Sequence, residues 1–277
     1  MDYLWNIVLG AVQGITEFLP VSSSGHLSAA QLLMRQHRIE TVGAANPMML
    51  EILLHLATLL AVLLFYRKDV VAAVHGIGLG ARALFRRRFG DAYRENPSIQ
   101  LVSALFVGTI PTGIIGFLLK DIASDVSQEP LLLGICFLVC AVLLASTRLF
   151  GNNTGHVTLR LALIIGIVQG IAVFPGISRS GMTIATALAL HINREEAVRF
   201  SFLLSIPAIL GAAILEFDAA AFFQESSILP IFAGALCAFA CGLGALVILV
   251  RTVKSGRLWA FSPYVAAVGI LCMAILR

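Results

Sequence analysis

The sequence predicts an all-α integral membrane protein, built as an inverted-topology repeat of six transmembrane helices and two re-entrant helix hairpins. Three observations support this fold class. The 277-residue chain is 59% hydrophobic and 12% charged, with a mean hydropathy of +0.94, which is too apolar for a soluble domain. Its apolar runs are long enough to cross a bilayer. Two polar stretches within it match each other.

Six continuous apolar runs approach the roughly 20 residues that a transmembrane helix needs. They are 48–66, 99–119, 131–149, 200–217, 228–250 and 259–276. Two further apolar regions, 4–34 and 159–191, are interrupted by proline, glycine and serine. Such backbone is tolerated at membrane depth only beside protein or water, so we expect both regions to form re-entrant helix–loop–helix hairpins. No cleavable signal peptide is expected, because Asp2 rather than a basic segment precedes the first apolar run.

Basic residues concentrate on one side of this topology. The loop expected at 67–96 carries seven arginines and lysines, which places it in the cytoplasm by the positive-inside rule. Fourteen basic residues fall on that side in all, against four on the other. Those four are Arg35, Arg38, Lys120 and Arg277, and they share the outer side with Asp121, Asp125, Glu129, Asp218 and Glu225. The bias holds only if each broken region enters and leaves on the same side.

The two broken regions are copies of one another. Residues 10–25 and 166–181 match at nine of sixteen positions with an offset of 156. Each opens a half of a single membrane domain, 1–152 and 153–277, and each half continues with three spans. Because three is odd, the second half is expected to lie upside down relative to the first, with the hairpin tips meeting near the bilayer midplane.

The tips hold the ionisable and hydroxyl side chains of interest. These are Gln13, Glu17, Ser22, Ser23, Ser24 and His26 in the first, and Ser178, Arg179, Ser180 and Thr183 in the second. Buried charges in a membrane mark functional sites, and a guanidinium suits phosphate or carboxylate. A structural Glu17–Arg179 ion pair is the simplest interpretation. It leaves unexplained an imidazole, several hydroxyls and the free N–H groups of two helix starts, which together favour phosphoryl chemistry. A glutamate beside phosphate holds a divalent metal or acts as a base.

These residues carry a family resemblance. Gln-Gly-Ile-Thr-Glu-Phe-Leu-Pro-Val-Ser-Ser-Ser-Gly-His at 13–26 and Pro-Gly-Ile-Ser-Arg-Ser-Gly at 175–181 resemble the two signature motifs of the undecaprenyl-pyrophosphate phosphatases of the bacitracin-resistance type. The likeness continues at 54–62, 110–111 and 200–207. It implies a hydrolase of the bacterial cytoplasmic (inner) membrane that converts the C55 lipid carrier pyrophosphate to the monophosphate for cell-wall synthesis, with a divalent cation, Mg²⁺ or Ca²⁺.

The resemblance also implies roles. Glu17 would be a catalytic or metal-binding carboxylate, and Arg179 would clamp the pyrophosphate. Ser23 would be the nucleophile and His26 the acid or base, while the remaining tip residues would bind substrate; these are Gln13, Ser22, Ser24, Ser178, Ser180 and Thr183. The family often has glutamate where this chain has Gln13, and threonine at Ser24. The residues alone do not separate the three serines from one another, and a metal-activated water is an equal alternative.

Two other function classes compete with a phosphatase. An inverted repeat is common in transporters, so a flippase of lipid-linked phosphate is the alternative; the imidazole and hydroxyls favour chemistry over simple anion carriage. A purely structural subunit leaves Glu17 and Arg179 unexplained. His55 and Glu51, four positions apart, either support the site or form a solvated pair. The expected partners are the membrane and a polyprenyl pyrophosphate lipid, with a homodimer left open; nucleic acid is not implied.

Overall fold

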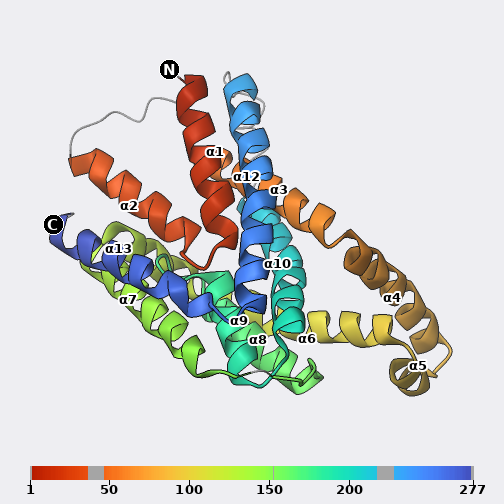
Figure 1. The fold of residues 1–277 in the computed structure, drawn as a ribbon. Helices are drawn as coiled ribbons and strands as arrows, with labels where there is room; N and C mark the ends of the chain where they lie inside the picture. Colours follow the sequence, from red (N-terminus) through yellow and green to blue (C-terminus); the bar gives the residue numbers. More distant parts are fainter. Residues whose placement is uncertain (1, 37–46, 152, 217–227, 276–277) are drawn as a thin grey trace.

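The computed structural model describes residues 2–36, 47–151, 153–216 and 228–275, which are almost wholly helical (Figure 1). Five of the described helices are long and apolar enough to cross a membrane, and the bent pair α3–α4 would make a sixth. The all-α, multi-pass prediction is therefore confirmed. The predicted sides of Arg38, Asp218, Glu225 and Arg277 concern residues outside the described ranges, as does the side chain of Arg35.

Both broken regions are helix pairs joined by a short turn. In the first, α1 (Asp2–Phe18) is followed by α2 (Ser23–Gln36), and in the second, α8 (Leu159–Ile171) is followed by α9 (Arg179–Ala189). The chain can reverse because each turn holds a residue in the left-handed region, Ser22 at φ +69° and Gly176 at φ +90°. The breaks lie where proline, glycine and serine interrupt the apolar pattern.

The expected spans coincide with long apolar helices. They are α3 (Pro47–Phe65), α6 (Pro97–Gln128), α7 (Pro130–Ser146), α10 (Arg194–Glu216), α12 (Ile228–Lys254) and α13 (Ser262–Ile275). Ordinary start signals set several of these boundaries. α6 and α7 both begin with proline, and the Asn96 side chain caps α6 by accepting from the N–H of Ser98 at 2.9 Å. At 32 residues α6 is about 48 Å long, so it exceeds the hydrocarbon core.

The segment 67–96, expected as a loop, is helical instead. It forms α4 (Arg67–Phe85) and α5 (Phe89–Glu95), and α4 leaves α3 at an angle of 87°. Charge placement indicates the side of the membrane but not the secondary structure. The five alanines and six arginines of this segment favour a helix. Gly76 and Gly80 are buried on α4, where the Gly76 backbone approaches Ser98 of α6.

Glycines bring the helices of the broken regions against their neighbours. Gly10 of α1 lies against Gly234 of α12, and Gly166 of α8 lies against Gly108 of α6, with backbone so close that a Cβ would overlap a carbonyl oxygen in either pair. Figure 1 shows α1 and α12 side by side. Gly10 and Gly166 each begin a Gly-x-x-x-Gly segment, a spacing that permits such close approach of two helices.

The main apolar core surrounds the two turns. Phe18, Phe137, Ile184 and Phe200 are almost fully buried and belong to one cluster with parts of α7, α9, α10 and α12. This packing holds the end of α1 and the start of α9 together, and it positions the polar residues that follow.

Candidate active site

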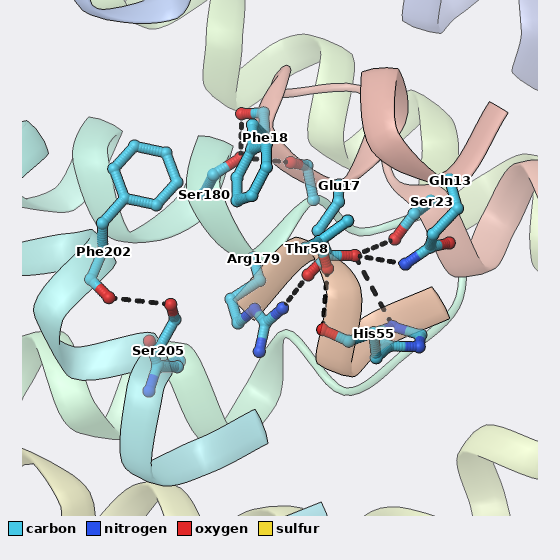
Figure 2. A network of polar contacts seen from close by, with 12 residues as sticks. Gln13, Glu17, Phe18, Ser23, His55, Thr58, Arg179, Ser180, Phe202 and Ser205 are labelled. Atoms are coloured by element: carbon cyan, nitrogen blue, oxygen red, sulfur yellow. Dashed lines mark hydrogen bonds and ion pairs between the residues drawn. The ribbon is translucent and has the colours of Figure 1, made fainter. Parts of the chain in front are cut away.

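Glu17 lies at the centre of a buried polar cluster where the two turns meet (Figure 2). Its side chain is 3% exposed. Oε1 accepts a hydrogen bond from Nη2 of Arg179. Oε2 accepts from Nε2 of Gln13 at 3.0 Å and from Oγ of Ser23 at 2.7 Å. Four of the predicted site residues, drawn from segments about 160 positions apart, therefore form one connected network.

Local structure explains this convergence. Gln13 and Glu17 are four residues apart on α1 and so share a helix face. After the reversal at 19–22, Ser23 begins α2 and its hydroxyl reaches back to Glu17. Arg179 is the first residue of α9, directly after its N-cap Ser178. The two turns thus bring Ser23 and Arg179 to the end of α1, where Glu17 lies.

Arg179 keeps donors beyond those that it uses on Glu17. A guanidinium has five N–H groups, and the Arg179 side chain is 26% exposed. It lines a narrow cavity of about 10 Å³, room for roughly one water. The other lining residues are Glu17, Phe18, Ser180, Thr183, Ser201, Phe202 and Ser205. A pyrophosphate could enter only if this cavity widened.

Ser22 and Ser178 occupy equivalent positions in the two turns and cap the helices that follow. Ser22 Oγ accepts from the N–H of Gly25 at 3.2 Å and from that of Gly176 at 3.0 Å, so it joins one turn to the other. Ser178 Oγ accepts from the N–H of Gly181 at 3.1 Å. Both side chains are buried. Their visible contacts are structural, whereas the sequence suggested substrate binding.

The other hydroxyls predicted to bind substrate lie around the second turn, with one exception. Ser180 Oγ donates to the carbonyl of Phe18 at 3.0 Å, a further link between the turns. Thr183 Oγ1 donates to the carbonyl of Arg179 at 2.9 Å. Both line the cavity beside Arg179. Ser24 is half-buried on α2 and does not line that cavity.

His26 points toward α13 rather than joining the Glu17 network. Its Nδ1 lies 2.7 Å from the carbonyl of Ser22, so Nδ1 carries a proton. In the neutral ring Nε2 then accepts from the hydroxyl of Tyr264, 2.8 Å away, and the two rings stack at 5.7 Å. Sequence reasoning missed Tyr264, because it lies 238 positions away and reads as an ordinary residue of a membrane helix.

His55 belongs to the site, which decides one alternative that the sequence left open. Its Nδ1 bonds the carbonyl of Glu51 at 2.9 Å, and its Nε2 lies 3.5 Å from Oε2 of Glu17. Thr58 Oγ1 donates to the carbonyl of His55 at 2.9 Å, one turn along α3. His55 thus adds a fourth element, α3, to α1, α2 and α9 in the environment of the buried carboxylate (Figure 2).

The candidate metal ligands at this site are oxygen atoms on and beside Glu17. In the described ranges no group of three or more histidine, cysteine or carboxylate side chains gathers at one point. Beside the carboxylate, Oε1 of Gln13 is buried and lacks a hydrogen-bond partner there. Mg²⁺ is commonly bound by one or two carboxylates together with substrate phosphates. This donor set fits a divalent cation shared with a phosphate, and it does not fit an all-protein metal site.

Comparisons with known proteins show the family of this chain. The family model described as bacitracin resistance protein BacA matches residues 6–271. A protein named undecaprenyl-diphosphatase from Methanosphaera stadtmanae is 39% identical over 99% of this chain and 98% of its own length. One of the same name from Desulfosudis oleivorans is 41% identical over 97% of each chain, and undecaprenyl-diphosphatase 4 of Bacillus thuringiensis is 38% identical over 99% and 98%. With a family match across nearly its whole length and a buried Glu17–Arg179 site between its two turns, the chain belongs to the bacitracin resistance protein BacA family.

Proposed function

We propose that this protein hydrolyses undecaprenyl pyrophosphate to undecaprenyl phosphate and inorganic phosphate. The observation that carries the proposal is the buried network of Glu17, Ser23 and Arg179, in a chain whose relatives are named for this activity. In the reaction the bond between the bridging oxygen and the terminal phosphorus breaks, and the oxygen of a water molecule ends on the released phosphate. The bridging oxygen stays on the lipid.

Arg179 is the proposed clamp for the pyrophosphate. In the substrate-free protein its charge is balanced by Glu17. A pyrophosphate brings more negative charge than one carboxylate, and a guanidinium binds phosphate bidentately. We expect the phosphate oxygens of the substrate to replace Glu17 as hydrogen-bond acceptors for part of the Arg179 guanidinium, and the cavity to widen as the substrate binds. The carboxylate is then released to accept a proton.

Ser23 is the best placed of the three serines to attack phosphorus. Its hydroxyl donates to Oε2 of Glu17 at 2.7 Å, which is the contact of a nucleophile with a base. Ser22 is less suited because its oxygen already accepts from two backbone N–H groups. A water held by the same carboxylate is the competing nucleophile, and the two differ in whether a phosphoserine forms.

His26 is proposed as the acid or base only through Nε2, since Nδ1 is bound to a carbonyl. To reach the substrate, Nε2 must exchange its bond with Tyr264 for one with a phosphate or leaving oxygen. Tyr264 would hold the ring in the required orientation until the substrate arrives. The tautomer itself is fixed by the hydrogen bond from Nδ1 to the carbonyl of Ser22, which is a common arrangement for catalytic histidines.

A divalent cation, Mg²⁺ or Ca²⁺, is part of the proposal. Glu17 and the free Oε1 of Gln13 would hold it together with the phosphates of the substrate. When bound, it would neutralise charge on the pyrophosphate and polarise its phosphoryl oxygens. Gln13 contributes a neutral oxygen where relatives are expected to have a carboxylate, so we expect weaker binding of the cation here.

The inverted repeat is proposed as the architecture of the site. Its halves, 1–152 and 153–277, are supported by the 156-residue match and by a reciprocal pattern of packing. α1 lies against α12 of the other half, and α8 lies against α6. We propose that the two hairpins are re-entrant, enter from opposite sides and meet near the midplane, so that the polyprenyl tail stays in lipid while the head group binds between the tips.

The remaining expectations concern location and partners. We propose the bacterial cytoplasmic (inner) membrane as the location, because the lipid carrier is used there. The flippase alternative is not favoured, since the relatives are named for hydrolysis. The homodimer stays a prediction, to be checked by cross-linking in the membrane.

The test is phosphate release from C55 pyrophosphate by purified protein, with Mg²⁺ and with a chelator. We expect Glu17→Gln and Arg179→Gln each to lose most of the rate, and the chelator to abolish it. Glu195→Gln and Lys254→Gln are matched controls, because each removes one charge from an exposed ion pair whose two residues do not line the site cavity. Turnover by both site variants at the wild-type rate would refute the site. Movement of the lipid without phosphate release would favour the flippase.

A further inference from the structure

α12 ends in a tight reversal that returns the chain to its own last turn. Gly256 has a left-handed φ of +71°. Its N–H donates to the carbonyl of Val253 at 2.9 Å, and the N–H of Arg257 donates to that of Thr252 at 3.0 Å. This pair of bonds is a Schellman motif, the usual glycine-dependent helix stop. As a result Arg257 lies at the level of Arg251 and Thr252, although it follows them in the sequence.

An open cavity of about 460 Å³ lies at this end of α12. It is lined by Arg251, Thr252, Ser255, Arg257, Ala260 and Phe261. Its volume falls within the range of small-molecule sites. Two arginines and Phe261 thus line one hollow where an apolar helix ends, together with Thr252 and Ser255, whose hydroxyls donate to the carbonyls of Ile248 and Thr252.

The two arginines of this cavity have no acidic partner among the described residues, whereas neighbouring basic residues are engaged in other contacts. Lys254 pairs with Glu195 at 3.2 Å, and Arg148 lies over the ring of Trp259 at 5.2 Å. Within the part of the chain that the structure describes, neither Arg251 nor Arg257 forms an ion pair.

Cations near a helix end commonly bind its last carbonyls, but those of α12 already have donors. The carbonyls of Arg251, Thr252 and Val253 accept from backbone N–H groups, and that of Lys254 accepts from Nη1 of Arg194 at 3.3 Å. The positive charge of Arg251 and Arg257 is therefore left for a ligand.

This cavity is separate from the Glu17 site. Where α1 and α12 pack, Gly10 lies against Gly234, and the Phe18 ring lies against Gly242. Thr252 follows Gly242 by ten residues, or about 15 Å along the helix. The two cavities share no lining residue. In Figure 1 this is the lower end of α12.

We propose that this cavity binds a phosphate group, either as free inorganic phosphate or as the head group of an anionic lipid. Two guanidinium forks on one hollow match the oxygens of a phosphate, and each can donate two parallel hydrogen bonds. Phe261 and Ala260 provide an apolar wall that would suit the glycerol or acyl portion of a lipid. The inference stands apart from the proposed hydrolysis, since it requires no turnover.

Binding of two probes tests the proposal. Inorganic phosphate is titrated by calorimetry into detergent-solubilised protein, and retention of phosphatidic acid against phosphatidylcholine is measured by native mass spectrometry. We expect the double variant Arg251→Gln/Arg257→Gln to bind phosphate or phosphatidic acid at least about tenfold more weakly than the wild type, because both bidentate contacts are lost. The probe that loses affinity identifies the source of the phosphate. Because Arg179 can also bind phosphate, the titration is repeated in Arg179→Gln, where the distal binding should persist.

Two controls make the result specific. Arg86→Gln/Arg88→Gln removes the same charge from exposed positions at the far end of α4 and should leave both probes unchanged. Arg251→Lys/Arg257→Lys keeps the charge without the fork and should give intermediate affinity. An equal loss of binding affinity in Arg251→Gln/Arg257→Gln and Arg86→Gln/Arg88→Gln, or no loss in either variant, would overturn the proposal. Hydrolysis of prenyl pyrophosphate should stay at the wild-type rate in the Arg251/Arg257 variant, which separates this inference from the active site.

Discussion

Removing the two members of the Glu17–Arg179 pair one at a time should have unequal effects on stability. The Glu17 side chain is 3% exposed, whereas that of Arg179 is 26% exposed. In Arg179→Gln a carboxylate stays buried without its cation, and such a loss costs about 3–5 kcal/mol. In Glu17→Gln the guanidinium can still reach solvent, so we expect a cost of about 1–2 kcal/mol, the scale of one charged hydrogen bond.

The double variant makes the prediction quantitative. With both charges gone, no unpaired ion remains buried, so Glu17→Gln/Arg179→Gln should be within about 1 kcal/mol of Glu17→Gln. It should therefore be more stable than Arg179→Gln alone. All three variants should lose phosphate release by more than about 100-fold, because the clamp or the base is missing.

Unfolding by sodium dodecyl sulfate in mixed micelles, followed by circular dichroism, measures these free energies. Asp69→Asn is the matched control. The side chains of Asp69 and Arg199 are 26% and 42% exposed, respectively, so their ion pair should contribute less than about 1 kcal/mol to the free energy of unfolding. If the two single losses simply added in the double variant, the pair would not be coupled. If Glu17→Gln proved the less stable single variant, the burial argument itself would be wrong.

Three further changes test separate parts of the proposal. Ser23→Ala should reduce phosphate release at least about 100-fold and lower stability by about 1–2 kcal/mol, because the buried Glu17 carboxylate loses one hydrogen bond; retention of more than half the rate, with no trapped phosphoserine by mass spectrometry, would assign the attack to water. Tyr264→Phe keeps the ring stacked on His26 but removes the donor to Nε2, so the rate should fall roughly 2- to 10-fold, the value of one hydrogen bond; an unchanged rate would show that this contact is incidental. Gly166→Leu should yield little folded protein by size-exclusion chromatography, because its Cβ would overlap α6, while Gly113→Ala, with open space around it, should behave as wild type.

Most helices and both breaks could be predicted from the sequence, because length, apolarity and the proline–glycine–serine interruptions are local signals. The helices α4 and α5 were not predicted, since the segment 67–96, with its seven basic residues, was assigned from charge alone, and charge orients a segment without determining its conformation. The 87° bend after Phe65 has no comparable signal. Beyond the bend, α4 packs against α6 where Gly76 lies against Ser98, a contact that no local sequence signal specifies.

The site was predictable to the same extent. Glu17, Ser23 and Arg179 stood out as costly polar residues in an apolar chain, and they lie together. The environment of His26 did not follow from its motif, because its partner Tyr264 comes from a different element. His55 could be suspected from its place in α3, but only packing decides that Nε2 faces Glu17.

The two copies of the turn show how one scaffold acquired an asymmetric site. At matching positions with the same residue, the side chains do structural work, as Ser22 and Ser178 do when each caps the helix that follows it. Three residues of the buried network, Glu17, Ser23 and Arg179, lie at positions where the copies differ.

Ser23 of the first copy corresponds to Arg179 of the second, and Glu17 corresponds to Val173. These exchanges supply the hydroxyl, the cation and the carboxylate of one network. Gln13 and Gln169 are the instructive intermediate case. Both amides are buried and each leaves Oε1 without a partner within the described ranges. Gln13 donates to Glu17, whereas Gln169 donates to the carbonyl of Leu204 at 3.2 Å. The same residue therefore contributes to the Glu17 network in one copy and to helix packing in the other, because its neighbours differ between the copies.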